Sequence, residues 1–415
     1  MHCFSSIQTG SRSLKIAVLD TIHGAGIIAQ RMAELGLEAQ ALEVYHHSPS
    51  VAGFDLIIAP VHLWPENPTL MEARRLGKTI ITHHQAVGQL ADPCCKVFEI
   101  TGTHSKTSTA LLLARILSIR GRVISHTTRG IELWSEGRSN LIKKGLSITP
   151  GNVIKSVEVA KDQSAKALVC EISLGGVGLA DYGVFTSFSE DYKIAGGTKW
   201  ATTAKLQMIS LSKIGFLLVA NIDVKISANV SFGEGGFIRA DRNRIYFGDT
   251  SLPLELEEEL DISGYQTALA GSAAAAHAAG FDEAEIVGAL EGFDGIEGRM
   301  KITYDGCMEI FDNSNSGLKV SDIERALNNV SGGSLGLVVG EEAETVCEGL
   351  NIPALVNLLR HRRIEIDFLV LVGNRLKPWA GELRAEMARD RAAGMELALA
   401  RRGVDRLLLC VKCFR

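Results

Sequence analysis

The sequence predicts an α/β protein of three domains, a size that 415 residues can fill. Two observations lead to this fold class. Short apolar runs alternate with segments of helical periodicity, which is the pattern of parallel strands joined by crossover helices. Glycine is frequent, at 42 residues, while aromatic residues make up only 6%. We therefore expect many tight turns around cores of small aliphatic side chains.

Residues 1–95 are predicted to form a Rossmann-like N-terminal substrate domain. Strands are expected at 14–19, 39–44, 56–59 and 79–82, with a helix at 25–35. Asp20, His23 and Gly24 follow the first of these strands, and His83 and His84 follow the last. Open α/β sheets bind ligands at the carboxyl ends of their strands. These residues are therefore candidates for substrate binding, and a metal site at His83 and His84 is a less favoured interpretation.

Residues 96–296 are predicted to form a central P-loop ATP-binding domain. Its strongest motif lies between a strand at 96–101 and a helix at 107–119, and comprises Gly102, Thr103, His104, Ser105, Lys106, Thr107 and Ser108. Backbone N–H groups and the helix dipole bind phosphate at such a junction. Lys106 can reach the β- and γ-phosphates, and the Thr107 hydroxyl can bind Mg²⁺. The loop is shorter than the common GxxxxGK[ST] form, and Ser105 replaces the glycine that usually precedes the lysine.

Later strands of the central domain are expected at 166–172, 182–187 and 216–221, with a hairpin at 231–248 and helices at 266–280 and 283–293. Residues 297–415 are predicted to form a doubly wound C-terminal domain. Its strands are expected at 308–311, 335–339, 368–372 and 407–411, and its helices at 319–328, 354–362 and 382–402. The lone Cys410-x-x-Cys413 pair lies in or beside the last strand, so we expect core thiols there rather than a zinc site.

The loop at 101–108 resembles the TGTxGKT loop of the Mur ligases and of folylpolyglutamate synthetase. Further segments resemble the Mur motifs in the family's order: Glu171-Ile172-Ser173, the segment 186–192, Ala204-Lys205-Leu206, Asn221-Ile222-Asp223, Gly298-Arg299-Met300 and Asp312-Asn313-Ser314. The resemblance implies a three-domain Mur-ligase-like architecture whose catalytic residues are Lys106, Glu171 and Lys205. It also implies that Asn221 contacts adenine, Arg299 the phosphates and Asp312 the ribose.

The same resemblance implies ATP and Mg²⁺ as cofactors. The metal ligands would be Thr107, Glu171 and a carbamylated Lys205. Tyr192 stands where the family has a metal-binding His, and Asp191 or water would fill that position. Hydroxyl, carboxylate and carbamate oxygens are the hard ligands that Mg²⁺ requires.

Segments 19–24, 81–87, 128–130 and 147–150 are similar to the coenzyme F-430 synthase family of methanogens. This resemblance implies that ATP activates a propionate of a nickel tetrapyrrole, and that a ring carbon of the same molecule attacks the acyl phosphate. Nickel would be present only within the substrate. Arg129 would then join the substrate-binding residues of the N-terminal domain.

Two other functions stay open: a Mur-type ligase that forms an amide with an amino acid or amine, and a non-catalytic nucleotide or tetrapyrrole carrier. The formal net charge of −5, without basic blocks, gives no reason to expect nucleic acid or an anionic membrane surface. The polar N-terminus shows no signal peptide and no apolar run is long enough to span a bilayer, so we expect a cytoplasmic protein.

Overall fold

The computed structural model describes residues 14–257, 260, 262–330, 332–342 and 349–413. The chain divides into two compact units. The first runs to Glu255 and also includes Tyr265–Glu291, and the second comprises Leu256–Gly264 and Gly292–Arg415. The domain boundaries at residues 95 and 296 remain predictions. Within the described residues, no helix is long and apolar enough to cross a membrane.

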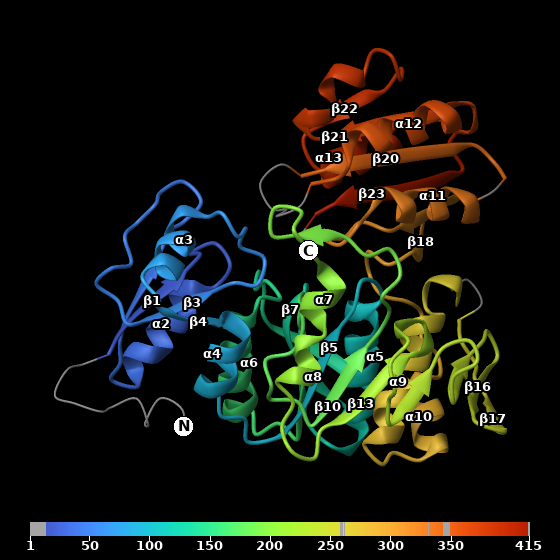
Figure 1. Ribbon diagram of the computed structural model, residues 1–415. Helices are drawn as coiled ribbons and strands as arrows, with labels where there is room; N and C mark the ends of the chain where they lie inside the picture. Colours follow the sequence, from blue (N-terminus) through green and yellow to red (C-terminus); the bar gives the residue numbers. More distant parts are fainter. Residues whose placement is uncertain (1–13, 258–259, 261, 331, 343–348, 414–415) are drawn as a thin grey trace. The chain divides into compact units, whose positions relative to one another are not determined.

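The N-terminal part of the first unit is a four-stranded parallel sheet in the order β2-β1-β3-β4 (Figure 1). The strands lie where the apolar runs predicted them: β1 (Lys15–Leu19), β2 (Glu38–Leu42), β3 (Leu56–Ala59) and β4 (Thr79–Thr82). The helices are α2 (Ala25–Glu34), α3 (Pro68–Arg75) and α4 (His83–Leu90). Because all four strands are parallel, the residues that follow them gather at one edge of the sheet.

Helix α4 begins directly after β4, and the sequence analysis did not predict it. Thr82 and Gln85 form a capping box: the Thr82 hydroxyl accepts from the Gln85 backbone N–H at 3.0 Å, and the Gln85 side chain accepts from the Thr82 N–H at 2.8 Å. This exchange satisfies two backbone donors that a helix start leaves unpaired. His83 and His84 consequently lie in the first turn of a helix.

An eleven-stranded sheet forms the rest of the first unit, in the order β17-β16-β15-β14-β13-β10-β5-β9-β6-β7-β8. Strands β15, β14, β13, β10, β5, β9 and β6 are parallel neighbours, and antiparallel strands extend both edges beyond them. The strands are β5 (Lys96–Thr101), β6 (Val123–Thr127), β7 (Gly130–Ser135), β8 (Arg138–Lys143), β9 (Ala167–Glu171), β10 (Tyr182–Phe185), β13 (Leu217–Asn221), β14 (Val230–Phe232), β15 (Ile238–Ala240), β16 (Arg244–Phe247) and β17 (Thr250–Pro253).

A two-stranded sheet, β11 (Lys193–Ile194) and β12 (Lys199–Trp200), precedes the short helices α7 and α8. The helices of this part are α5 (Lys106–Leu117), α6 (Pro150–Asp162), α7 (Ala201–Lys205), α8 (Gln207–Ser210), α9 (Gln266–Ala278) and α10 (Glu283–Leu290), with 3₁₀ turns η1 (Ser118–Arg120) and η2 (Ile222–Val224). Helix α6 and the β6–β8 meander are elements that the sequence analysis did not predict.

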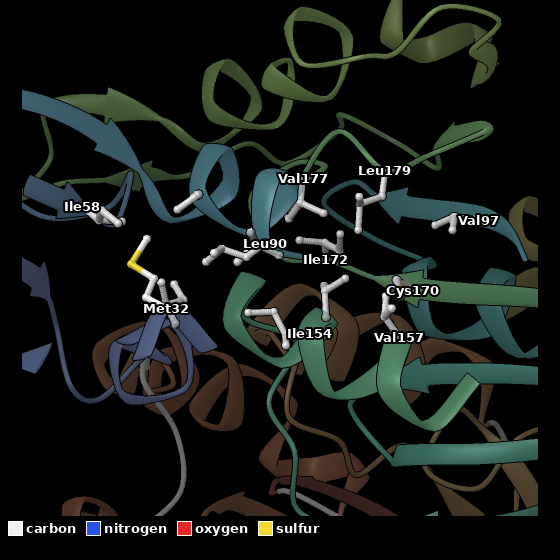
Figure 2. Packing of buried hydrophobic residues seen from close by; sticks show 14 of the residues in the cluster. Met32, Ile58, Leu90, Val97, Ile154, Val157, Cys170, Ile172, Val177 and Leu179 are labelled. Atoms are coloured by element: carbon white, nitrogen blue, oxygen red, sulfur yellow. The ribbon is translucent and has the colours of Figure 1, made fainter. Parts of the chain in front are cut away.

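A shared apolar core joins the two sheets of the first unit. Figure 2 shows Met32 and Leu90 from the N-terminal helices beside Ile154 of α6 and Val177 of the central part. Each such side chain contributes about 1.5–3 kcal/mol when it is fully buried. Gly88 of α4 lets the two parts approach closely, because a Cβ there would lie 2.0 Å from the Val177 carbonyl oxygen.

The second unit contains a six-stranded sheet in the order β18-β19-β23-β20-β21-β22. All neighbours are parallel except the β18–β19 pair. Its elements are β18 (Lys301–Asp305), β19 (Met308–Asp312), α11 (Val320–Asn329), β20 (Leu335–Glu341), α12 (Ile352–Arg362), β21 (Phe368–Val372), β22 (Glu386–Ala388), α13 (Arg391–Leu399) and β23 (Arg406–Lys412), with 3₁₀ turns η3 (Ile262–Gly264), η4 (Arg363–Glu365) and η5 (Asn374–Trp379).

The helix predicted at 382–402 is wrong in its first half. Residues Glu386–Ala388 form strand β22, which pairs with β21, and α13 begins only at Arg391. The Asp390 side chain caps that helix by accepting from the Ala393 N–H at 2.8 Å. Local helical periodicity therefore gave way to a tertiary strand pairing at the sheet edge. Cys410 and Cys413 are buried in the core, as predicted.

Candidate active site

The predicted phosphate loop lies between β5 and α5, and β5 is an interior strand of the parallel part of the large sheet. Gly102 has a φ of 153°, and a Cβ there would lie 2.1 Å from the Thr186 hydroxyl oxygen, so only glycine fits. The Thr103 N–H and hydroxyl both donate to the Ser187 carbonyl, at 2.8 and 3.0 Å. The end of β10 therefore fixes the shape of the loop before any ligand is bound.

Ser105, directly before α5, adopts the left-handed conformation with a φ of 60°. Lys106 and Thr107 are then the first two residues of that helix, where backbone N–H groups attract anions. His104 lies beside Glu190, with 3.2 Å between its Nε2 and the carboxylate oxygen Oε2. The conformation explains why glycine is usual at the position of Ser105.

Thr107, Glu171 and Thr128 meet at the start of α5. The Thr107 hydroxyl donates to Glu171 Oε2 at 2.9 Å, and the Thr128 N–H donates to the same oxygen at 3.3 Å. Thr107 and Glu171 are both buried, although the sequence separates them by 64 residues. Arg129, next to Thr128, places its Nη2 3.2 Å from Glu132 Oε1. The hydroxyl and carboxylate pair is a hard-oxygen donor set of the kind that holds Mg²⁺.

Lys205 is fully buried at the end of α7, and its ammonium group donates to the Ser173 carbonyl. Ser173 comes two residues after Glu171, so Lys205 reaches the same strand end as the oxygen pair. The Tyr192 ring lies 5.8 Å from the Lys205 nitrogen. Burial of a charged ammonium group is costly, whereas the amine form can accept CO₂ to become a carbamate.

Asp191 caps the helix that carries Lys205. Its carboxylate accepts from the Thr202 N–H at 3.1 Å, from the Thr202 hydroxyl and from the Tyr192 N–H at 2.8 Å. This arrangement positions α7, and a metal-ligand role for Asp191 remains a prediction.

Asn221 lies at the end of β13, and its side-chain oxygen accepts from the Asp223 N–H at 3.1 Å. Ser187, after β10, donates to Asp223 at 2.5 Å, so these residues lie at the same sheet edge as the loop. Arg299 and Asp312 belong to the second unit. There Asp312, at the end of β19, accepts from the Ser314 N–H at 2.9 Å and lies 3.5 Å from Arg391 Nη1.

Asp20 and His23 follow β1 at the carboxyl edge of the N-terminal sheet. Asp20 is fully buried with a φ of 80°, and its Oδ1 accepts from the backbone N–H groups of Ile22 and His23, both at 3.1 Å. Its Oδ2 lies 2.6 Å from His23 Nδ1. Burial would raise the pKa of the Asp20 carboxyl, but hydrogen bonds and charge from His23 and His62 outweigh it and hold this pKa well below its usual range.

The sequence analysis missed two residues that complete this group. The Tyr45 hydroxyl lies 3.0 Å from Asp20 Oδ2, and His62 Nε2 lies 3.2 Å from the same oxygen. Tyr45 follows β2 and His62 follows β3, so the strand-end rule that selected His23 also applies to them.

His83 and His84 are buried rather than open to solvent. His83 Nε2 donates to the Leu19 carbonyl at 2.9 Å, and burial lowers the pKa of His83 to about 4. Neither ring nitrogen of His84 has a hydrogen-bond partner among the described residues. Burial, with smaller effects from His83, His62 and Lys205, lowers the pKa of His84 to about 3. Both rings are therefore neutral near pH 7.

The N-terminal edge lies against the segment that carries Lys205. Val61 packs against the apolar cluster that includes Ile194 and Ala204, and its carbonyl accepts from Lys199 Nζ at 3.4 Å. A Cβ on Gly24 would lie 3.3 Å from the Thr149 hydroxyl oxygen, at the start of α6. The candidate substrate residues Asp20, His23 and Gly24 are thus held beside the central part of the same unit.

Comparison with known proteins relates the whole chain to one family. Residues 302–413 match a family model described as Coenzyme F430 synthetase CfbE, C-terminal domain. A Coenzyme F(430) synthetase of Methanosarcina acetivorans is 34% identical over 467 aligned positions, covering 97% of this chain and 99% of the relative.

Two solved structures share the fold. MurF from Acinetobacter baumannii aligns over 98% of this chain and 92% of its own, with a TM-score of 0.57 and 13% identity. A bifunctional folylpolyglutamate synthase/dihydrofolate synthase with Mn, AMPPNP and L-glutamate bound aligns over 80% of this chain and 91% of its own, with a TM-score of 0.58 and 15% identity. The Mur-ligase-like architecture predicted from the sequence is confirmed.

Proposed function

The chain belongs to the coenzyme F(430) synthetase family, and on this premise we propose that it is an ATP-dependent ligase that closes a carbon ring on a nickel tetrapyrrole. A propionate carboxylate of the substrate would attack the γ-phosphorus of ATP, giving an acyl phosphate and ADP. A carbon of the same molecule would then attack the acyl carbon, the C–O bond to phosphate would break, and the proton of the attacking carbon would pass to water.

The observation that carries the first step is the buried oxygen pair at the end of the phosphate loop, Thr107 Oγ1 and Glu171 Oε2 at 2.9 Å. Together with a carbamylated Lys205 they fit Mg²⁺, which takes oxygen ligands. Mg²⁺, when bound, neutralises charge on the phosphates during transfer. Lys106, at the first position of α5, would hold the transferring phosphoryl group. The structural neighbour that carries Mn and AMPPNP supports a nucleotide and a divalent ion on this fold.

The second unit supports an intramolecular nucleophile. The first lysine after Asp312 is Lys319, the N-cap of α11, so the segment 312–314 that resembles the Mur motif is not followed directly by a lysine. The buried Asn315 amide there donates to the carbonyls of Gly298 and Asn313, both at 3.0 Å, so it serves the local fold. A ring-closing enzyme orders one organic substrate rather than two. Holding the reacting groups in orientation can lower the activation barrier by up to roughly 7–11 kcal/mol. Ring closure also favours a dry site, since water competes for the acyl phosphate.

The test is the product mass after incubation of the protein with ATP, Mg²⁺ and the ring-open nickel tetrapyrrole in amine-free buffer. We expect the substrate to lose one water for each ADP released. An unchanged substrate mass with no ADP would contradict the proposal. A product that forms only with an added amino acid, and retains its mass, would instead assign the protein to the amide-forming Mur ligases.

A further inference from the structure

A group of four side chains at the carboxyl edge of the N-terminal sheet has the geometry of a metal site. Asp20 follows β1, Tyr45 follows β2 and His62 follows β3, while His23 lies three residues beyond Asp20. One atom of each faces the others: Asp20 Oδ2, His23 Nδ1, Tyr45 Oη and His62 Nε2. The group thus draws on three adjacent parallel strands, in the order β2-β1-β3.

The four atoms form the corners of a small tetrahedron. Asp20 Oδ2 lies 2.6 Å from the His23 nitrogen, 3.2 Å from the His62 nitrogen and 3.0 Å from the Tyr45 oxygen. The remaining separations are 3.3 Å between the two nitrogens, and 3.2 and 3.5 Å from the Tyr45 oxygen to His62 and His23. Metal–ligand bonds of about 2.0–2.1 Å give tetrahedral edges of about 3.3–3.4 Å, so five of the six edges need to change by a few tenths of an ångström at most.

Hydrogen bonds alone satisfy these four side chains poorly. Three groups converge on the single oxygen Asp20 Oδ2, and the two imidazole nitrogens that point at it lie only 3.3 Å from each other. If both nitrogens carry hydrogens, those hydrogens crowd together. A cation at the centre would instead meet a lone pair from every corner. The carboxylate is already oriented for this, because its other oxygen accepts two backbone N–H groups.

The ligand types select the ion. Two imidazoles and one carboxylate suit Zn²⁺ and its transition-metal neighbours, whereas Mg²⁺ and Ca²⁺ take oxygen ligands. We propose that Asp20, His23 and His62, with Tyr45 at the fourth corner, bind one divalent transition-metal ion such as Zn²⁺, at a site separate from the oxygen pair of Thr107 and Glu171. This site does not depend on the proposed reaction.

Such an ion would fix the loop that follows β3. His62 follows Val61, which packs against the apolar cluster of Ile194 and Ala204. It is close in sequence to Trp64, whose Cβ would lie 3.1 Å from a Cβ on Gly196. An ion bound by both His62 and Asp20 would therefore hold this loop against the segment that leads into α7 and Lys205. The side chains of His23 and His62 are 19% and 27% exposed, which leaves a path for the ion from solvent.

The experiment uses the full chain, stripped of metal with a chelator and titrated with Zn²⁺ alone in the presence of excess Mg²⁺. We expect calorimetry and elemental analysis to give one Zn²⁺ per chain. His62→Ala should weaken binding at least about 100-fold, since loss of even an outer-shell partner costs 10–100-fold. His62 is partly exposed, so this variant should fold, and circular dichroism checks that it does.

His47→Ala is the matched control. His47 Nδ1 also lies near a carboxylate, 2.8 Å from Glu43 Oε2, but the pair is on the surface and lies outside the four-atom group. This variant should bind Zn²⁺ like the wild type. Absence of stoichiometric binding by the wild type, or equal affinity in His62→Ala, would overturn the proposal.

Substitution with Co²⁺ provides a second readout. Visible absorption bands should appear in the wild type and disappear in His62→Ala. A thiolate-to-cobalt charge-transfer band would instead show that cysteines bind the ion, and would also overturn the assignment. Cys94 and Cys95, which are adjacent and not buried, would then be tested first.

Discussion

The carboxyl edges of the two parallel sheets in the first unit follow the same topological rule but carry different chemistry. At the edge of the central sheet, Thr107 and Glu171 present hydroxyl and carboxylate oxygens beside a loop shaped by glycine. At the edge of the N-terminal sheet, His23 and His62 place two imidazoles around the buried Asp20. The comparison shows that strand order decides where a site forms, while the side chains decide which ligand it selects.

The largest expected effect tests the oxygen-bearing edge. Lys106→Ala should lower ATP turnover by about a thousand-fold or more, because a cation on the transferring phosphoryl group contributes on that scale. Steady-state ADP release by the folded variant is the measurement. Lys96→Ala is the control, since Lys96 is exposed at the start of β5, the strand that leads into the loop, and pairs with Asp181. Turnover of Lys106→Ala near the wild-type level would contradict the phosphate-loop assignment.

The next effect concerns Lys205. Lys205→Ala should lower turnover by about 100-fold or more, as loss of a metal ligand does, and wild-type turnover should fall when bicarbonate is stripped. Carbon-13 labelled bicarbonate should give a carbamate signal in the wild type that the variant lacks. Lys199→Ala, which removes only a surface lysine bound to the Val61 carbonyl, should keep the signal. An unmodified Lys205 in an active, bicarbonate-saturated sample would refute the carbamate.

A smaller effect concerns stability in acid. His126 in β6 is fully buried, and burial lowers its pKa to about 4 against a smaller raising effect from the Ser147 backbone. The pKa is thus lower in the folded than in the unfolded chain, where it is about 6.5. The contribution of His126 to the free energy of unfolding is therefore complete above that pH. It falls as the pH drops towards 4, by about 3 kcal/mol at most.

Urea unfolding at pH 7.5 and pH 5 measures this difference. His126→Leu should lose less stability between these two pH values than the wild type does. An equal loss in both proteins would show that other groups dominate the acid response.

The smallest expected effect concerns Ser105. Ser105→Gly should change the free energy of unfolding by no more than about 1 kcal/mol, towards greater stability, because glycine removes the strain of the left-handed conformation but gains freedom in the unfolded chain. Thermal melting and ADP release should both stay close to the wild type. A marked loss of turnover would show that the serine side chain itself contributes to the site.

Local patterns in the sequence determined much of this protein. Apolar runs predicted most of the parallel strands, since a strand buried on both faces needs them, and Lys106 and Thr107 stood out because a phosphate loop is a continuous segment. The same local reasoning failed at β22, whose three residues are held by pairing with β21.

Only the tertiary structure decided which distant residues meet. Tyr45 and His62 lie 25 and 42 positions from Asp20, as the residue numbers give, and no periodicity relates them until β2, β1 and β3 align. His84 is buried where His62 and Lys205, from distant segments, act on its pKa. The capping of α7 by Asp191 depends on how the chain between them folds. Contacts of this kind arise from the register of a sheet and the packing of helices on it, which a linear sequence does not display.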